Sequence, residues 1–108
     1  MELLQISLRG HLTRNQLEQA FDSIEADLES STSPLNLIVD CSSMTGYDMA
    51  ARSTFIEWNK KWRRSINKVA IVTENTLFHM VIRIMAKVTS QQMKYFTDLG
   101  SAVEWAQE

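Results

Sequence analysis

The sequence predicts an α/β fold in which four strand–helix units form a mostly parallel sheet covered by helices. Residues 35–41 are almost continuously apolar and include the β-branched Ile38 and Val39, as in a strand buried on both faces of a sheet. Patterns typical of strands and of amphipathic helices alternate four times along the chain. Such alternation indicates parallel strands joined by right-handed crossovers.

The first strand is expected over residues 4–9, because apolar and polar side chains alternate there, and Gly10 is expected to end this edge strand. Thr13 and Gln16 form a capping-box pattern at the start of a helix over about residues 14–29. The apolar residues of that helix recur at spacings of four, three and four: Leu17, Phe21, Ile24 and Leu28.

The central strand is expected to end in a short polar turn. Ser42, Ser43 and Gly46 are typical turn residues, and Asp48 is expected to cap a helix that reaches about residue 64. The apolar side of this helix consists of Ala51, Phe55, Trp58 and Trp62. The carboxyl end of a parallel strand beside a helix start is where open α/β sheets place their sites, so a working surface is expected here.

The second half of the chain supplies the remaining elements. A buried strand is expected over residues 68–73, and Asn75 or Thr76 should cap a helix that reaches about residue 88. A last short strand over residues 92–97 and a closing helix over residues 99–106 complete the pattern.

The third helix has more apolar surface than one sheet can cover. Its apolar residues span about 200° of the helix, where about half would suffice. They are Leu77, Phe78, Met80, Val81, Ile82, Ile84, Met85 and Val88. Three partners remain open: other helices of the same domain, a second copy or protein partner, and an apolar ligand. The candidate ligand or dimer surface is Phe78, Met80, Ile84 and Met85.

Length and composition indicate one soluble domain over residues 1–108, with 44% hydrophobic and 22% charged residues. The apolar runs are far too short to span a bilayer, and residues 1–5 lack the pattern of a signal peptide. We therefore expect no integral membrane segment and a cytoplasmic location. The single cysteine cannot form an internal disulfide, so nothing in the chain requires an oxidising compartment.

The net charge of −2 hides an asymmetry between the two parts of the chain. Residues 1–48 carry a net charge of −6, and residues 49–108 carry +4. This polarity could orient a partner or a self-association, and it could equally reflect two solvated helices of opposite charge.

The chain resembles the STAS domain, the SpoIIAA-like fold of anti-sigma-factor antagonists. The resemblance rests on residues 6–10, Leu37-Ile38-Val39-Asp40, a short turn and Asp48 at a helix start. Residues 68–73, Tyr95-Phe96 and residues 102–106 look more like the small bacterial SpoIIAA-like proteins of unassigned function. The resemblance covers nearly the whole chain and implies a SpoIIAA-like fold.

The resemblance also implies a regulatory, protein-interaction role at the strand–helix junction. STAS antagonists carry an Asp and then a phosphorylatable Ser there; Asp48 matches the Asp, but Met49 replaces the Ser. The phosphate switch is therefore absent, and an interaction module that lacks it is expected, in the form of a homodimer or a complex with a protein partner. The expected partner-binding residues are Ser43, Thr45, Tyr47, Asp48, Met49 and Arg52. A likeness of this branch to CRAL-TRIO lipid carriers implies an alternative role as a carrier or sensor of a lipid or other apolar ligand.

Catalytic patterns are scarce, and no enzymatic activity is expected. Cys41 could pair with His11 or His79 as nucleophile and base, but a cysteine ending an apolar strand is typically a small buried hydrophobe, and both histidines are expected at the surface. Asp40 and Asp48 are explained by turn and cap hydrogen bonds. No cofactor is expected, because no glycine-rich phosphate loop or metal-ligand spacing occurs.

A nucleic-acid partner is not expected, because the chain as a whole is acidic. The densest basic cluster is Lys60, Lys61, Arg63, Arg64 and Lys68.

Overall fold

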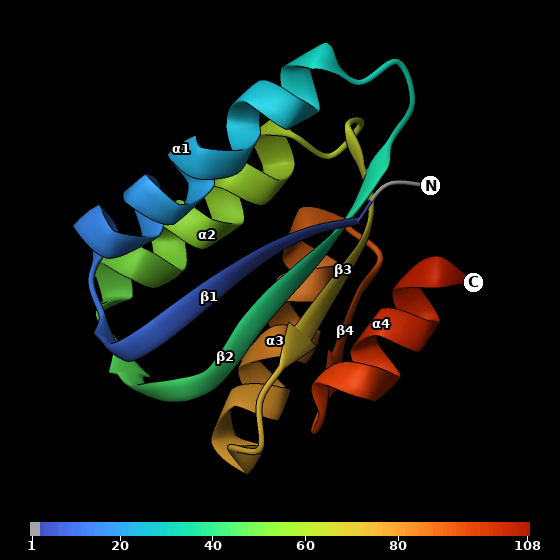
Figure 1. The fold of residues 1–108 in the computed structure, drawn as a ribbon. Helices are drawn as coiled ribbons and strands as arrows, with labels where there is room; N and C mark the ends of the chain where they lie inside the picture. The colour runs from blue at the N-terminus through green and yellow to red at the C-terminus, as the bar shows by residue number, and fades with distance from the viewer. Residues whose placement is uncertain (1–2) are drawn as a thin grey trace.

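The computed structural model describes residues 3–108, so residues 1 and 2, with which the predicted domain begins, lie outside the described residues. The elements are β1 (Leu3–Leu12), α1 (Arg14–Ser30), β2 (Leu35–Tyr47), α2 (Met49–Lys61), β3 (Ile66–Val72), α3 (Thr76–Thr89), β4 (Met93–Phe96) and α4 (Leu99–Gln107). The strands form one sheet in the order β1-β2-β3-β4, and every neighbouring pair is parallel (Figure 1). The predicted α/β fold of four strand–helix units is confirmed.

The helices cover the two faces of the sheet unequally. Because the strand order follows the chain order, crossovers of one hand place α1, α2 and α3 on the same face. No strand follows α4, and this helix packs alone on the opposite face, against β2 and β3 (Figure 1).

Two apolar cores follow from this arrangement. The larger lies under α1, α2 and α3 and includes Phe21 and Trp58, whose rings stack with their centroids 3.8 Å apart. The smaller consists of Ile38, Ala70, Val72, Ala102 and Ala106. Leu37 and Val39 belong to the larger core and Ile38 to the smaller, which confirms that the central strand is buried on both faces.

The helix starts largely follow the sequence prediction. Thr13 and Gln16 form the predicted capping box of α1, and the side chain of Asn75 accepts a hydrogen bond from Leu77 N at the start of α3. The exception is Asp48, which makes no side-chain cap bond to α2. Its carboxylate instead lies 2.6 Å from His11 Nε2 and ties the end of β1 to the start of α2.

The predicted ends of the first two strands are wrong, and the difference shapes the candidate site. β1 continues through Gly10, which adopts a positive φ of 61° at an irregularity in the strand pairing. β2 continues through the expected turn to Tyr47, paired with β1 up to Leu12. Pairing between β2 and β3 ends at Asp40, so residues 42–47 form a two-stranded extension with β1. We call this extension the β1–β2 ribbon.

Other boundaries shift by a few residues. α2 ends at Lys61, three residues before the expected end, and β3 begins at Ile66, two residues earlier than expected. Lys68 does not join the predicted basic cluster, since its Nζ donates a hydrogen bond to Trp105 O at 2.9 Å and lies over the Trp105 ring.

For α3 the structure narrows a question that the sequence leaves open and corrects one expectation. Packing within the domain buries Ile82 and Met85 but leaves four apolar side chains of this helix exposed: Leu77, Met80, Ile84 and Val88. His79 is not a free surface histidine, because its ring stacks on Tyr95 at 3.7 Å and its Nε2 lies 3.1 Å from Thr73 O.

Candidate functional site

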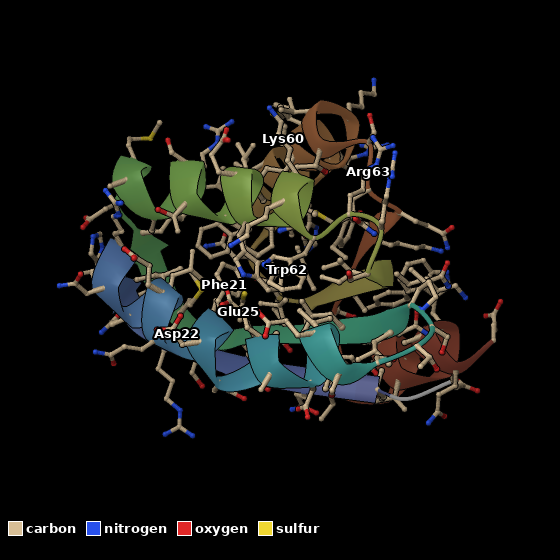
Figure 2. All side chains as sticks on the ribbon, turned by 90° about the horizontal axis from the view of Figure 1, so that it is seen from above. Phe21, Asp22, Glu25, Lys60, Trp62 and Arg63 are labelled. Atoms are coloured by element: carbon tan, nitrogen blue, oxygen red, sulfur yellow. The ribbon has the colours of Figure 1, made fainter. Side chains whose placement is uncertain are left out.

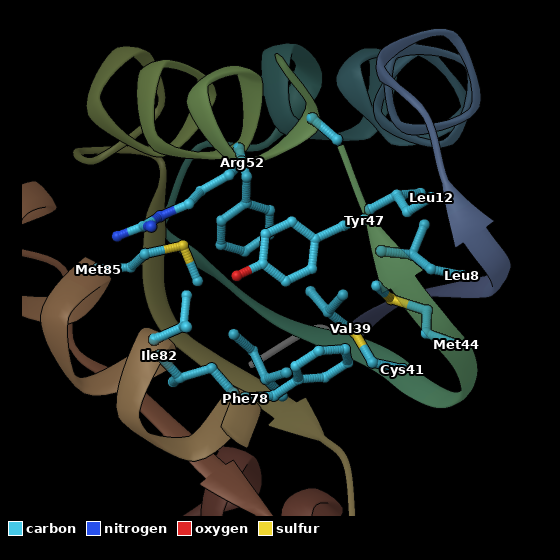
Figure 3. Close-up of a pocket in the computed structure, with 14 residues that line it drawn as sticks. Leu8, Leu12, Val39, Cys41, Met44, Tyr47, Arg52, Phe78, Ile82 and Met85 are labelled. Carbon is cyan, nitrogen blue, oxygen red and sulfur yellow. The ribbon is translucent and has the colours of Figure 1, made fainter. Parts of the chain in front are cut away.

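A small apolar pocket lies between the β1–β2 ribbon, α2 and α3, at the carboxyl end of the sheet (Figure 3). Its volume is about 70 Å³, its exposed lining is entirely apolar, and it is open on one side. The ribbon contributes Met44 and Tyr47, α2 contributes Arg52, and α3 contributes Phe78 and Met85. The pocket therefore occupies the place where parallel α/β sheets commonly bind their ligands.

The sequence forms this pocket because the ribbon extends beyond β3. Residues 42–47 have no β3 neighbour, so the end of the ribbon lies beside the first turn of α3 rather than within the sheet. The Tyr47 and Phe78 rings meet there with their centroids 5.5 Å apart. Val39 and Cys41 line the pocket from β2, because they point to the face of the sheet that α1, α2 and α3 cover.

Polar groups are found at the edge of the pocket. Figure 3 shows the Tyr47 ring inside the pocket with its hydroxyl toward α3, and the Arg52 side chain extending from α2 toward Met85. Arg52 is half-buried and forms no ion pair with any residue in the part of the chain that the structure describes. Because the lining is apolar, the arginine lines the pocket with its aliphatic carbons and leaves its charge available to an approaching group.

The structure brings together four of the residues predicted from sequence and leaves the others apart. Tyr47 and Arg52 from the predicted partner surface meet Phe78 and Met85 from the predicted apolar surface in one pocket. The remaining candidates do not line it: Ser43, Thr45, Asp48, Met49, Met80 and Ile84. Met49, where the resemblance to STAS antagonists implies a switch serine, is 66% exposed at the start of α2.

Sequence analysis missed several pocket residues. Leu8 and Leu12 line the pocket from β1, and the alternation of apolar residues in that strand was the signal for Leu8. The sequence places Met44 in a polar turn. Met44 lines the pocket only because residues 42–47 pair with β1 instead of forming that turn.

The chemistry of Cys41 does not favour nucleophilic catalysis. Burial, with a smaller contribution from Asp40, raises the pKa of the Cys41 thiol to about 12, so the reactive thiolate is scarce at neutral pH. The two histidines are engaged elsewhere: His11 with Asp48, and His79 with Thr73 and Tyr95.

Asp40 and Ser42 hydrogen-bond to each other, so neither is a free catalytic group. Ser42 donates from both its hydroxyl and its backbone N–H to Asp40 Oδ1, as expected for turn-type hydrogen bonding. Among residues 3–108 no group of three or more His, Cys, Asp and Glu side chains is placed to hold a metal ion. None of the helices in this range is long and apolar enough to cross a membrane.

The fold and the pocket define a small parallel α/β domain with an apolar pocket at the carboxyl edge of its sheet. A model of the SpoIIAA-like family matches residues 3–107, and the chain belongs to this family. The resemblance inferred from sequence is confirmed.

A solved structure from Shewanella loihica PV-4, of an uncharacterised protein with a SpoIIAA-like fold, is similar to this chain. The TM-score is 0.78 and the sequence identity is 22%, and the alignment covers 94% of this chain and 82% of the other. At this identity the likeness supports the fold alone. A search of curated proteins gave no match.

Proposed function

We propose that the domain is a non-enzymatic interaction module of the cytoplasm that binds a protein partner where Tyr47 and Arg52 flank the apolar pocket. One apolar side chain of the partner enters the pocket, and an acidic group of the partner pairs with Arg52. The observation that carries this proposal is the pocket itself, which unites residues from β1, β2, α2 and α3 at one edge of the sheet.

The size of the pocket favours a single side chain. A volume of about 70 Å³ holds roughly five to seven water molecules, because each water needs about 10–15 Å³ of such volume. A leucine or phenylalanine side chain is of that order, whereas a lipid tail is several times larger. Aromatic or aliphatic anchors that fill such pockets commonly dominate the energy of protein interfaces.

The surroundings of the pocket favour a complementary partner. Tyr and Arg are enriched at the centres of protein interfaces, and here Tyr47 and Arg52 stand on two sides of the same opening. Since Arg52 lacks an ion pair among the described residues, a carboxylate of the partner could neutralise its charge.

A binding role without catalysis is supported by the state of the titratable groups. The only cysteine is buried, and its pKa is raised. His11 contacts Asp48 and His79 contacts Thr73 O, so the described hydrogen bonds of the two histidines do not involve Cys41. The residues that line the pocket include no His, Asp, Glu or Lys that could act as an acid or base.

A comparative pull-down tests this proposal. Val81 lines the pocket and is half-buried, so Val81→Phe should fill the pocket without opening a cavity in the core. We expect the partner captured by the wild type to be lost with Val81→Phe and with Arg52→Glu, and retained with Leu99→Ser, an exposed position on α4. Equal capture by all four proteins would refute docking at the pocket.

A second candidate function is the binding of a small apolar molecule, favoured by the entirely apolar lining. Native mass spectrometry of the freshly purified protein distinguishes the two. Extra mass that is present in the wild type and absent in Val81→Phe would assign the pocket to a ligand. A wild-type spectrum with no extra mass would leave the protein partner as its occupant.

A further inference from the structure

We infer that the exposed side of α3 binds an acidic amphipathic helix of another protein. The inference rests on the proposed function only in treating the domain as a protein-binding module, because the surface is separate from the pocket. The surface consists of Leu77, Met80, Ile84 and Val88, and we call it the α3 stripe.

The α3 stripe is unusual within this molecule. Its side chains are 76%, 69%, 45% and 48% exposed in chain order, although each is large and apolar. The part of the chain that the structure describes has only two other exposed large hydrophobic side chains, Met49 at the start of α2 and Leu99 on α4. Contiguous exposed apolar surface of this kind marks interaction sites.

The shape of the stripe fits one helix. Its residues follow one another at spacings of three, four and four along α3, so at about 100° per residue they span only about 80° of the helix. An apolar seam this narrow is typical of helix–helix packing, whereas a helix that packs on a sheet shows a broader face. Helices that bind such seams present apolar residues at i, i+3, i+4 and i+7.

The charges around the stripe select an acidic partner. α3 contains no Asp or Glu, and its exposed Arg83 and Lys87 border the stripe on one side. α2 packs beside α3, and Arg63 follows just beyond the end of α2 (Figure 2). None of these three cations forms an ion pair with a described residue. A helix that brings carboxylates to both sides of its apolar seam would pair with them.

A second copy of this chain satisfies the charge pattern poorly. An isologous contact of α3 with α3 would bring Arg83 and Lys87 close to the same residues of the other copy, which is repulsive. Among the described helices, α1 carries the most acidic side chains, and Figure 2 labels two of them, Asp22 and Glu25. The apolar side of α1 is fully buried, so α1 offers charge without an apolar seam. The observations therefore favour a foreign helix.

A pair of designed peptides tests this inference. Each has about 20 residues, long enough to form a helix on binding, with leucines at i, i+3, i+4 and i+7. One carries Glu beside the leucines and the other carries Lys at the same positions. Fluorescence anisotropy with the full chain should show the Glu peptide binding at least tenfold more tightly than the Lys peptide.

Variants locate the binding. Met80→Glu with Ile84→Glu should weaken binding of the Glu peptide at least tenfold, whereas Leu99→Glu on α4 should leave it unchanged. Arg83→Glu with Lys87→Glu should reverse the preference toward the Lys peptide, and this charge-only pair carries the test if the first double variant fails to fold. Val81→Phe should leave binding within about twofold, which separates the stripe from the pocket.

Several outcomes would overturn the inference. One is equal binding of both peptides, and another is loss of binding in Val81→Phe alone, which would assign the peptide to the pocket. Sedimentation of the protein with phosphatidylglycerol vesicles, without binding of either peptide, would assign the stripe to an anionic membrane. A wild-type dimer that Met80→Glu dissociates would assign it to a second copy.

Discussion

Helices α1 and α3 pack on the same face of the sheet and both have amphipathic sequences, yet they differ in how fully their apolar sides are covered. The four apolar residues that define α1 are all buried: Leu17, Phe21, Ile24 and Leu28. On α3, Ile82 and Met85 are buried while four other large apolar residues face outward. α1 lies against β1 and α2, and α3 lies against β4 and α2. The comparison separates a helix that stabilises the fold from one whose outer side is available for binding.

The largest expected effect is at Phe21 of α1. This side chain is 1% exposed and stacks on Trp58, so Phe21→Ala should lower the free energy of unfolding by about 3–5 kcal/mol. Met80→Ala on α3 is the matched change and should cost less than about 0.5 kcal/mol. Urea unfolding measures both. Similar losses for the two variants would contradict the contrast between the helices.

Within α3, neighbouring isoleucines sharpen the same comparison. Ile82 is 4% exposed and Ile84 is 45% exposed, although only one residue lies between them. Ile82→Ala should cost about 2–4 kcal/mol and Ile84→Ala less than about 1 kcal/mol. A thermal melt of each variant gives the test, and a reversed order would mean that α3 is rotated relative to the sheet.

The core under α3 also contains a group that responds to pH. Burial raises the pKa of the Cys41 thiol to about 12 from an unfolded value of 9.0. Between these two values the unfolded chain has lost the proton that the folded chain keeps, so stability should fall as pH rises from about 9 to 12. The slope should approach about 1.4 kcal/mol per pH unit. Urea midpoints across this range should show the slope in the wild type, and Cys41→Ala should remove it.

The N-terminal caps of α1 and α3 should contribute similarly to stability, although the apolar sides of the two helices differ in burial. The Thr13 side chain accepts a hydrogen bond from Gln16 N, and the Asn75 side chain accepts one from Leu77 N. Thr13→Ala and Asn75→Ala should each lower the free energy of unfolding by about 1 kcal/mol. Asp48→Ala should cost less through capping, because Asp48 makes no cap bond. Any remaining cost at Asp48 should come from its contact with His11, so additive costs of Asp48→Ala and His11→Ala in a double-mutant cycle would contradict that assignment.

Much of the fold could be predicted because local patterns and tertiary structure agree. The stripe of α1, the two-sided burial of residues 37–39 and the caps at Thr13 and Asn75 all depend on spacing within one element. The ends of β1 and β2 could not be predicted in this way. Residues 42–47 look like a turn, and only pairing with β1 through Gly10 keeps them extended.

The candidate site was predicted in two separate parts. Tyr47 and Arg52 came from the strand–helix junction and Phe78 and Met85 from the apolar excess of α3, and their meeting in one pocket depends on the ribbon. The helical wheel gave the width of the α3 apolar surface but not which part of it faces the core. Met80 and Met85 have similar hydrophobicity, and only the contact of α3 with α2 and the sheet distinguishes them.

The measurement that tests the account most directly is methyl NMR of the protein labelled at its methionine methyl groups, during titration with the Glu peptide. Met44 and Met85 line the pocket, Met80 belongs to the α3 stripe, and Met93 lies on β4 and belongs to neither set of residues. Binding at the proposed surface should shift the Met80 signal first, with Met85 affected through α3, and should leave Met93 unchanged. Shifts confined to Met93, or no shift at any methionine, would contradict the claim that the side of the molecule formed by α2 and α3 is its working surface.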